Sequence, residues 1–144
     1  MKVLVLNGPN LGTLGSREPD VYGTRTLADL EAMVTKHARE LGLEVSCRQS
    51  NHEGQLIDWI ETQGAGSDAI LINPGALSHY SLALADALRG SGKPVVEVHI
   101  SNVFGREPER QRMVTAAAAR GVISGLGFDG YLAALDYLAR LGGG

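Results

Sequence analysis

Apolar residues along this chain fall into two kinds of run. Short continuous runs, such as Val3–Leu6 and Ala69–Ile72, are typical of parallel strands that are buried on both faces of a sheet. Longer segments repeat apolar residues every three or four positions, which is the period of an amphipathic helix. The pattern predicts five strands, at Lys2–Leu6, Leu43–Arg48, Asp68–Asn73, Pro94–Ile100 and Gly121–Leu126.

Helical patterns separate these strands, at about residues 27–41, 56–64, 84–90, 108–119 and 132–141. Thr26 and Asp29 form a capping box for the first helix, and Gly42 is its C-terminal stop. Pro108 suits the first turn of the fourth helix, and Gly142–Gly144 reads as a frayed tail. The alternation predicts an α/β fold, a flavodoxin-like doubly wound sandwich with a five-stranded parallel sheet in the order 2-1-3-4-5.

Composition narrows the class of protein. The 144 residues are expected to form a single domain, and 44% hydrophobic with 20% charged residues is an ordinary soluble balance. A net charge of -3 argues against nucleic acid or an anionic membrane as a partner. No run approaches 18 apolar residues, and Met1 leads straight into a strand, so neither a membrane span nor a signal peptide is expected. The single cysteine, Cys47, excludes an internal disulfide and fits a cytoplasmic location.

Polar residues cluster directly after the first, third and fourth predicted strands. The segments are Asn7–Asn10, then Asn73–Gly75 with Ser78 and His79, and finally His99, Ser101 and Asn102. In a flavodoxin-like order these three strands are neighbours, and ligands bind beyond the carboxyl ends of the strands where the order reverses. The polar segments are therefore expected to converge on one cleft.

The residues near that cleft favour a small anion as the ligand. Arg17, Arg106 and Arg110 offer guanidinium groups for a carboxylate or a phosphate. The glycines after the first strand do not have the GxGxxG spacing, and no GK[ST] follows them, so nucleotide binding has little support.

Tyr22 and His99 are the candidate groups for proton transfer. Only about one phenol in a thousand is ionised at pH 7, but a nearby arginine such as Arg17 lowers the pKa of a phenol and makes it a plausible base. His99 is a natural acid, and Glu97 shares its strand face and is placed to orient it. Asn10 and Asn73 offer amides for a water, an enolate oxygen or a carboxylate. Spacing alone is equally consistent with Tyr22 as a turn aromatic and His99 as a core histidine.

The ordered motifs resemble the type II 3-dehydroquinate dehydratases over residues 3 to about 139. They are Asn7-Gly8-Pro9-Asn10-Leu11, Arg17-Glu18-Pro19-x-x-Tyr22-Gly23, Gln49-Ser50-Asn51-x-Glu53-Gly54, Asn73-Pro74-Gly75-Ala76-x-Ser78-His79, Glu97-Val98-His99-Ile100-Ser101-Asn102, Arg106-Glu107-x-x-Arg110 and the run from Gly121 to Tyr131. Two departures stand out. Residues 111–115 lack the His-Ser pair that is often seen there, and Gly12 replaces a second asparagine.

The resemblance implies a lyase that removes water in trans from 3-dehydroquinate to give 3-dehydroshikimate through an enol or enolate. It implies Tyr22 as the base, His99 as the acid, Arg17 as the arginine of a mobile lid loop over about residues 11–24, and Asn10 as the holder of an intermediate-stabilising water. It further implies substrate contacts from these groups: Asn73, the amides of Ile100 and Ser101, His79, Arg110, and Asp86 from a neighbouring subunit.

The same resemblance implies no metal and no cofactor, and a homo-oligomer that is typically a dodecamer built from trimers. It leaves open a role in the shikimate pathway or in quinate breakdown. Arg106 is similar to a further loop arginine of the family, for which the resemblance specifies no role.

Three other functions compete on sequence alone. A flavodoxin-like phosphoacceptor or FMN module would need acidic strand ends or a phosphate cradle, which the motifs lack. A small-anion binding protein would use the same pocket without catalysis. Schiff-base dehydration would need a lysine in the cleft, whereas Lys2 and Lys93 precede strands and Lys36 lies on a helix.

Overall fold

Five parallel strands form one sheet in this computed structural model, which describes residues 1–16 and 19–143, without the side chains of Val21 and Tyr22. The strands are β1 (Lys2–Asn7), β2 (Glu44–Gln49), β3 (Ala69–Asn73), β4 (Val95–His99) and β5 (Gly121–Ser124). Their order is β2-β1-β3-β4-β5, with every neighbouring pair parallel. The predicted fold and strand order are confirmed.

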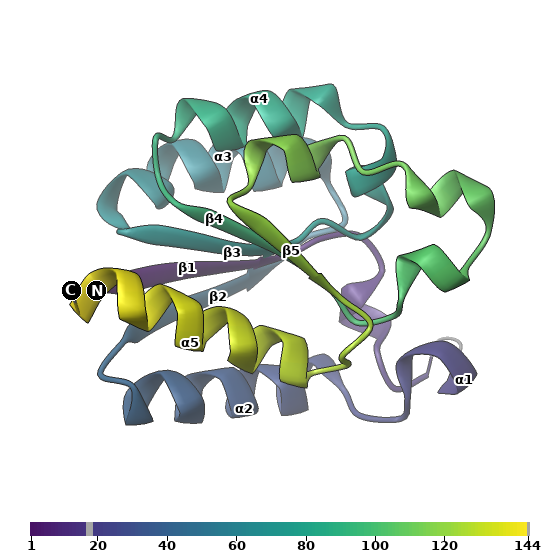
Figure 1. Ribbon diagram of the computed structural model, residues 1–144, viewed down its shortest axis with the longest axis horizontal. Coiled ribbons are helices and arrows are strands. Elements are labelled where there is room, and N and C mark those ends of the chain that lie inside the picture. Colours follow the sequence, from purple (N-terminus) through teal and green to yellow (C-terminus); the bar gives the residue numbers. More distant parts are fainter. Residues whose placement is uncertain (17–18, 144) are drawn as a thin grey trace.

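Helices α2 (Leu27–Glu40), α3 (Glu53–Thr62), α4 (Leu82–Gly90) and α5 (Asp129–Gly143) cover the two faces of the sheet. The short helix α1 (Pro19–Tyr22) lies beyond one end of the sandwich. Short 3₁₀ turns complete the connections, at Leu11–Thr13, Gly64–Gly66, Gly75–His79, Val103–Gly105, Pro108–Gln111 and Thr115–Ala118. Figure 1 shows α3 and α4 on one side of the sheet and α2 and α5 on the other, which makes a three-layer sandwich.

The buried core has two halves, one on each face of the sheet. Successive strand residues point to opposite faces. Val3 and Val5 therefore pack with α2 and α5, whereas Leu4 and Leu6 pack with α3 and α4. All four side chains are at most 1% exposed. This double burial explains why the strand sequence is continuously apolar rather than alternating.

The ends of α2 follow the sequence signals. The Thr26 hydroxyl accepts a hydrogen bond from the Asp29 N–H at 3.1 Å, and the Asp29 carboxylate accepts one from the Thr26 N–H at 2.9 Å. This is the predicted capping box. At the other end Gly42 has φ 74°, and the Leu43 N–H donates to the Ala38 carbonyl at 2.8 Å. A left-handed residue at this position closes the helix, and glycine adopts that conformation without strain.

The predicted fourth helix, at about residues 108–119, is wrong. Two separate 3₁₀ turns, Pro108–Gln111 and Thr115–Ala118, occupy this stretch, and Arg112 between them is extended. Contacts with the 75–79 turn account for the break: the Arg112 carbonyl accepts a hydrogen bond from His79, and the Val114 N–H donates to the Ser78 carbonyl at 2.6 Å. A helix would need these same backbone groups for its own ladder.

Two predicted boundaries also differ at the end of the chain. The last strand stops at Ser124 rather than Leu126, because Gly125 turns the chain with φ 94°. Helix α5 continues through Gly143, whereas a frayed tail was expected from Gly142. The Met1 side chain lies against Gly142, where an added Cβ would sit 2.9 Å from the Met1 Cε, so this end of the helix has a packing partner.

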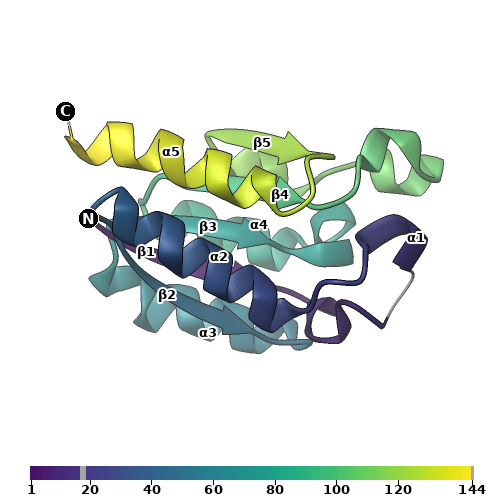
Figure 2. The ribbon, with the colours of Figure 1, turned by 90° about the horizontal axis from the view of Figure 1, so that it is seen from below.

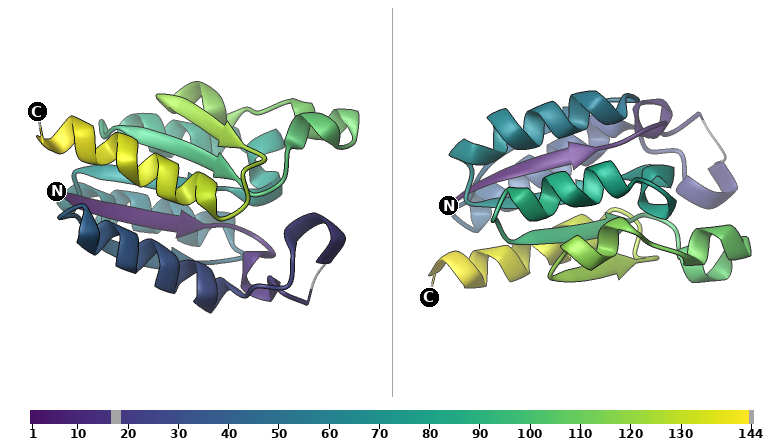
Figure 3. Two further views of the ribbon diagram at one scale, coloured as in Figure 1. Left: turned by 60° about the horizontal axis from the view of Figure 1, so that its bottom comes forward. Right: turned by 90° about the horizontal axis from the view of Figure 1, so that it is seen from above.

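The two termini lie together at the end of the sandwich opposite α1 (Figures 2 and 3). The loops that follow the carboxyl ends of the strands lie at the α1 end. Among the residues that the structure describes, no helix is both long and apolar enough to span a membrane.

Replacing Thr26 with alanine removes one acceptor of the capping box. We expect Thr26→Ala to lower the free energy of unfolding by about 1 kcal/mol, measured by urea titration, and Thr26→Ser to retain most of it. Equal losses in both variants would contradict a role for the hydroxyl.

Candidate active site

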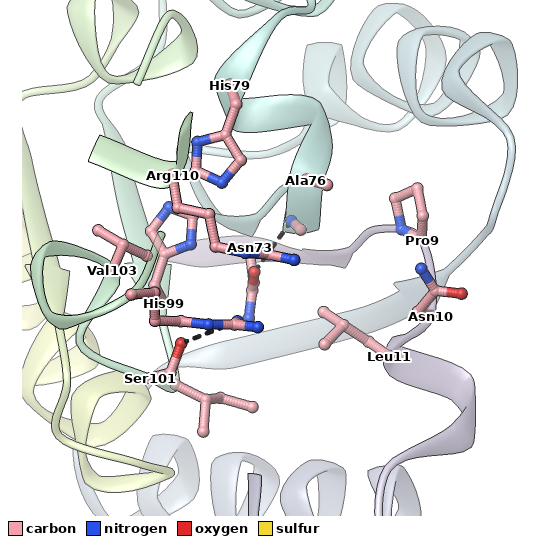
Figure 4. Close-up of a pocket in the computed structure, with 13 residues that line it drawn as sticks. Pro9, Asn10, Leu11, Asn73, Ala76, His79, His99, Ser101, Val103 and Arg110 are labelled. Atoms are coloured by element: carbon pink, nitrogen blue, oxygen red, sulfur yellow. Dashed lines mark hydrogen bonds between the residues drawn. The ribbon is translucent and has the colours of Figure 1, made fainter. Parts of the chain in front are cut away.

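A cleft of about 130 Å³ lies beyond the carboxyl ends of β1, β3 and β4. Strand order reverses between β1 and β3, which is where doubly wound sheets bind ligands. The cleft is lined by Pro9, Asn10, Leu11, Asn73, Gly75, Ala76, His79, His99, Ile100, Ser101, Val103, Arg106 and Arg110. The polar segments after these three strands therefore converge, as the sequence predicted (Figure 4).

Asn10 is held by the loop that follows β2. Its backbone is left-handed, with φ 72°, and its N–H donates to the Asn51 side-chain oxygen at 3.0 Å. Gln49 donates both to that same oxygen at 3.1 Å and to the Gly8 carbonyl at 3.2 Å. A Cβ on Gly8 would lie 2.6 Å from the Pro74 carbonyl oxygen, so only glycine permits this close approach of the loops after β1 and β3.

His99 ends β4 and pairs with a fully buried carboxylate. Its Nε2 lies 2.7 Å from the Glu97 Oε2, so the pairing that the shared strand face suggested is present. The same oxygen accepts a hydrogen bond from Ser78 at 2.8 Å, and the other carboxylate oxygen accepts one from Thr115 at 2.5 Å. Because Nε2 is engaged by Glu97, Nδ1 is the ring nitrogen left for chemistry in the cleft.

His79 is fixed through its opposite ring nitrogen. The Arg112 carbonyl, which can only accept, lies 2.7 Å from the His79 Nδ1, so Nδ1 carries a proton. That leaves Nε2 of His79 for a ligand. The rings of His79 and His99 are stacked, with centroids 6.3 Å apart (Figure 4).

The cleft also carries the positive charge that an anionic ligand requires. Arg106 reaches the Ser101 hydroxyl at 3.5 Å. Arg110 donates from its Nε to the Glu107 carboxylate at 2.6 Å, and this bond holds the pKa of the Glu107 carboxyl below its ordinary value. A guanidinium has further N–H groups beyond Nε, so Arg110 still has donors for a ligand.

Asn73 lies in the centre of the cleft, between the two histidines and the 9–11 segment (Figure 4). Its side-chain oxygen accepts a hydrogen bond from the Gly75 N–H at 3.1 Å, and its Nδ2 donates to the Tyr131 hydroxyl at 2.9 Å. Ile100 and Ser101 line the wall beside it.

Three of the predicted site residues lie elsewhere or outside the description. Arg17 is outside the described residues, and so is the side chain of Tyr22, whose backbone belongs to α1. Asp86 does not line the cleft. It lies on α4 with 79% of its side chain exposed, beside Arg89.

Sequence reasoning assigned no role to Thr115, Asn51 or Tyr131. Asn51 and Tyr131 stood in noted motifs, but nothing in their spacing indicated which residues they contact. Thr115 was placed inside a predicted helix, so its contact with Glu97 had no signal in the sequence.

Known proteins that resemble this chain decide its family. Residues 1–139 match the family described as dehydroquinase class II. The chain belongs to this family. Its resemblance to the type II 3-dehydroquinate dehydratases is thereby confirmed.

Named relatives of the dehydroquinase family match over almost the full chain. The chain is 56% identical over 140 residues to a 3-dehydroquinate dehydratase of Deinococcus radiodurans, covering 96% of this chain and 98% of the relative. It is 55% identical over 139 residues to that of Thermus thermophilus, covering 96% and 93%.

Solved structures agree. The type II dehydroquinase of Propionibacterium acnes superposes with a TM-score of 0.92 at 49% identity, covering 96% of both chains. That of Butyrivibrio crossotus gives 0.93 at 47% identity, covering 96% of this chain and 97% of the other.

The described residues contain no group of three or more His, Cys, Asp or Glu side chains that could hold a metal ion. The expectation of no metal and no cofactor stays a prediction.

Thr115 offers a test of the buried carboxylate. Thr115→Val keeps the side-chain shape but removes a donor from Glu97, so we expect about 1–3 kcal/mol less stability against urea and a lower kcat with little change in KM. Thr115→Ser should restore both, and Thr35→Val, at an exposed position on α2, should change neither. An unaltered kcat in Thr115→Val would show that the Glu97 network does not position His99.

Proposed function

We propose that this protein catalyses the trans-dehydration of 3-dehydroquinate to 3-dehydroshikimate. The observation that carries the proposal is the full-length match to the dehydroquinase family, together with a cleft that presents a carboxylate-paired histidine beside arginine and asparagine. No lysine lines this cleft among the described residues, which argues for an enolate route over a Schiff base.

In the first step of the proposed reaction, the Tyr22 phenolate removes a proton from C2 of the substrate. The electrons of the C–H bond move toward the ring carbonyl and form an enol or enolate. Asn10 holds a water that stabilises the negative oxygen. Arg17 is assigned the role of stabilising the ionised form of the phenol.

In the second step, His99 gives a proton to the C1 hydroxyl, the C1–O bond breaks and water leaves. The electrons of the enolate form the new C1–C2 double bond. Glu97 takes the Nε2 side of the imidazole, so Nδ1 delivers the proton. Tyr22 ends with one extra proton and His99 with one fewer, and solvent exchange restores both.

Substrate binding follows from the remaining cleft residues. Asn73 and the backbone amides of Ile100 and Ser101 hold the carboxylate. His79 accepts a hydrogen bond from a ring hydroxyl through Nε2, since its Nδ1 proton is committed to the Arg112 carbonyl. Arg110 contacts a second hydroxyl, and Arg106 adds positive charge close to the carboxylate.

The decisive experiment follows the ultraviolet absorbance of the conjugated enone after 3-dehydroquinate is added. We expect absorbance to grow with the wild-type protein, and Tyr22→Phe to lower kcat by about two or more orders of magnitude while it keeps ligand binding. The matched control is Tyr137→Phe, which removes a partly exposed phenol on α5 and should keep full activity. Binding without turnover by the wild-type protein would instead identify an anion-binding protein.

The proposal includes an assembly of identical subunits, a dodecamer built from trimers, in which Asp86 reaches a neighbour's cleft. A hollow of about 680 Å³ between α3 and α4, lined in part by Asp86, leaves room for another subunit on this face. Two large apolar side chains at the start of α4 are exposed. Tyr80, 67% exposed, lies on the turn before the helix, and Leu82, 66% exposed, is its first residue. A cytoplasmic location, in biosynthesis or in quinate breakdown, belongs to the same proposal.

Asp86→Asn tests this arrangement. We expect about tenfold lower turnover with an unchanged sedimentation coefficient, and no loss in Asp58→Asn, which alters an exposed carboxylate on α3. Co-refolding equal amounts of Asp86→Asn and Tyr22→Phe subunits should regain about a quarter of the sites, because some then combine an intact Tyr22 with a neighbour's Asp86. Activity no higher than the average of the two variants would contradict a shared site.

A further inference from the structure

Three buried polar side chains form a chain of hydrogen bonds beneath the cleft. The Tyr131 hydroxyl lies 2.6 Å from the Asn7 side-chain oxygen and 2.9 Å from the Asn73 Nδ2. Tyr131 is fully buried, and Asn7 and Asn73 are 1% and 3% exposed. The three residues come from α5, β1 and β3, so the contact joins one covering helix to two strand ends.

The direction of each bond follows from the number of available protons. Burial raises the pKa of the Tyr131 phenol, so the hydroxyl keeps its single proton. That proton goes to the Asn7 oxygen, which can only accept. The Tyr131 oxygen is then free to accept, and it takes an N–H from Asn73.

The side-chain oxygen of Asn73 also has a partner, which fixes the orientation of the amide. The Gly75 N–H needs an acceptor and finds the Asn73 oxygen at 3.1 Å. Flipping this amide would set its NH₂ group against the Gly75 N–H and its oxygen against a hydroxyl whose proton is already committed. Asn73 is therefore locked with its nitrogen toward Tyr131, and one N–H is left for the cleft.

This arrangement of hydrogen bonds leaves one buried N–H donor, the Nδ2 of Asn7, without a partner among the described residues. Buried unsatisfied donors are rare because each costs free energy. The opposite orientation of Asn7 would satisfy the Tyr131 oxygen instead, and would release the tyrosine proton toward Asn73.

We infer that Tyr131 is a positioning residue: with Asn7 it orients the Asn73 amide so that an N–H, and not the oxygen, faces the carboxylate of the substrate. The inference rests on the proposed function. An amide oxygen in that place would repel the carboxylate, so the orientation decides whether Asn73 attracts or rejects the ligand. Tyr131 itself does not touch the substrate.

A double-mutant cycle on the full-length protein tests the inference. Tyr131→Phe removes only the hydroxyl, and we expect it to raise KM for 3-dehydroquinate about tenfold with kcat nearly unchanged, because carboxylate binding serves ground and transition states alike. In an Asn73→Ala background the same change should alter KM less than twofold. Tyr137→Phe is the control for loss of a phenol from α5 and should leave KM unchanged in both backgrounds.

A second cycle uses Asn7→Ala, which keeps Tyr131 but frees its proton. It should also raise KM, and again only while Asn73 is present. If Tyr131→Phe does not fold, this cycle alone decides. If Tyr131→Phe and Asn7→Ala raise KM by the same factor with and without Asn73, the inference is overturned and the proposed function stands. If the wild-type protein shows no turnover, both are overturned.

Discussion

The buried carboxylate of Glu97 is the constraint around which the site is organised. An ionised group inside an apolar sheet costs several kcal/mol unless its oxygens receive hydrogen bonds. Glu97 is 0% exposed and takes hydrogen bonds from Ser78 and Thr115, with His99 paired beside them. These partners come from the turn after β3, the turn before β5 and the end of β4. The hydrogen bonds to this one buried carboxylate thus fix three segments that surround the cleft.

This constraint also explains why the sequence predicted the sheet well and the 108–119 stretch poorly. Strands and long helices are predicted from the periodic spacing of apolar residues, which is a local property of the sequence. In β1, Val3 and Val5 pack on one face of the sheet and Leu4 and Leu6 on the other, as this spacing requires. The 108–119 stretch has helix-forming residues, but its conformation is decided by acceptors and donors far away in the chain. Thr115 reaches back 18 residues to Glu97, and no local pattern reports that contact.

The position of the site could be predicted from the strand order, whereas its hydrogen-bonding geometry could not. Parallel strands bring their carboxyl ends to one edge, so asparagine and histidine after three neighbouring strands had to meet. Which atom of each side chain faces the ligand depends on contacts such as Asn73 with Tyr131, separated by 58 residues. The spacing of the motifs indicates where the cleft lies. Which atom of each side chain faces it is indicated only by a family resemblance or a structure.

A common arrangement runs through the cleft. His99 commits Nε2 to Glu97, His79 commits Nδ1 to a backbone carbonyl, and Asn73 commits its oxygen and one N–H to Gly75 and Tyr131. Each side chain therefore presents to the cleft one atom of known hydrogen-bonding character. Groups held in this way do not have to reorient as charge develops, which is the main source of electrostatic catalysis. A reaction through an enolate needs such groups on the scaffold, because its negative charge moves from the carbonyl oxygen to the departing hydroxyl within one pocket.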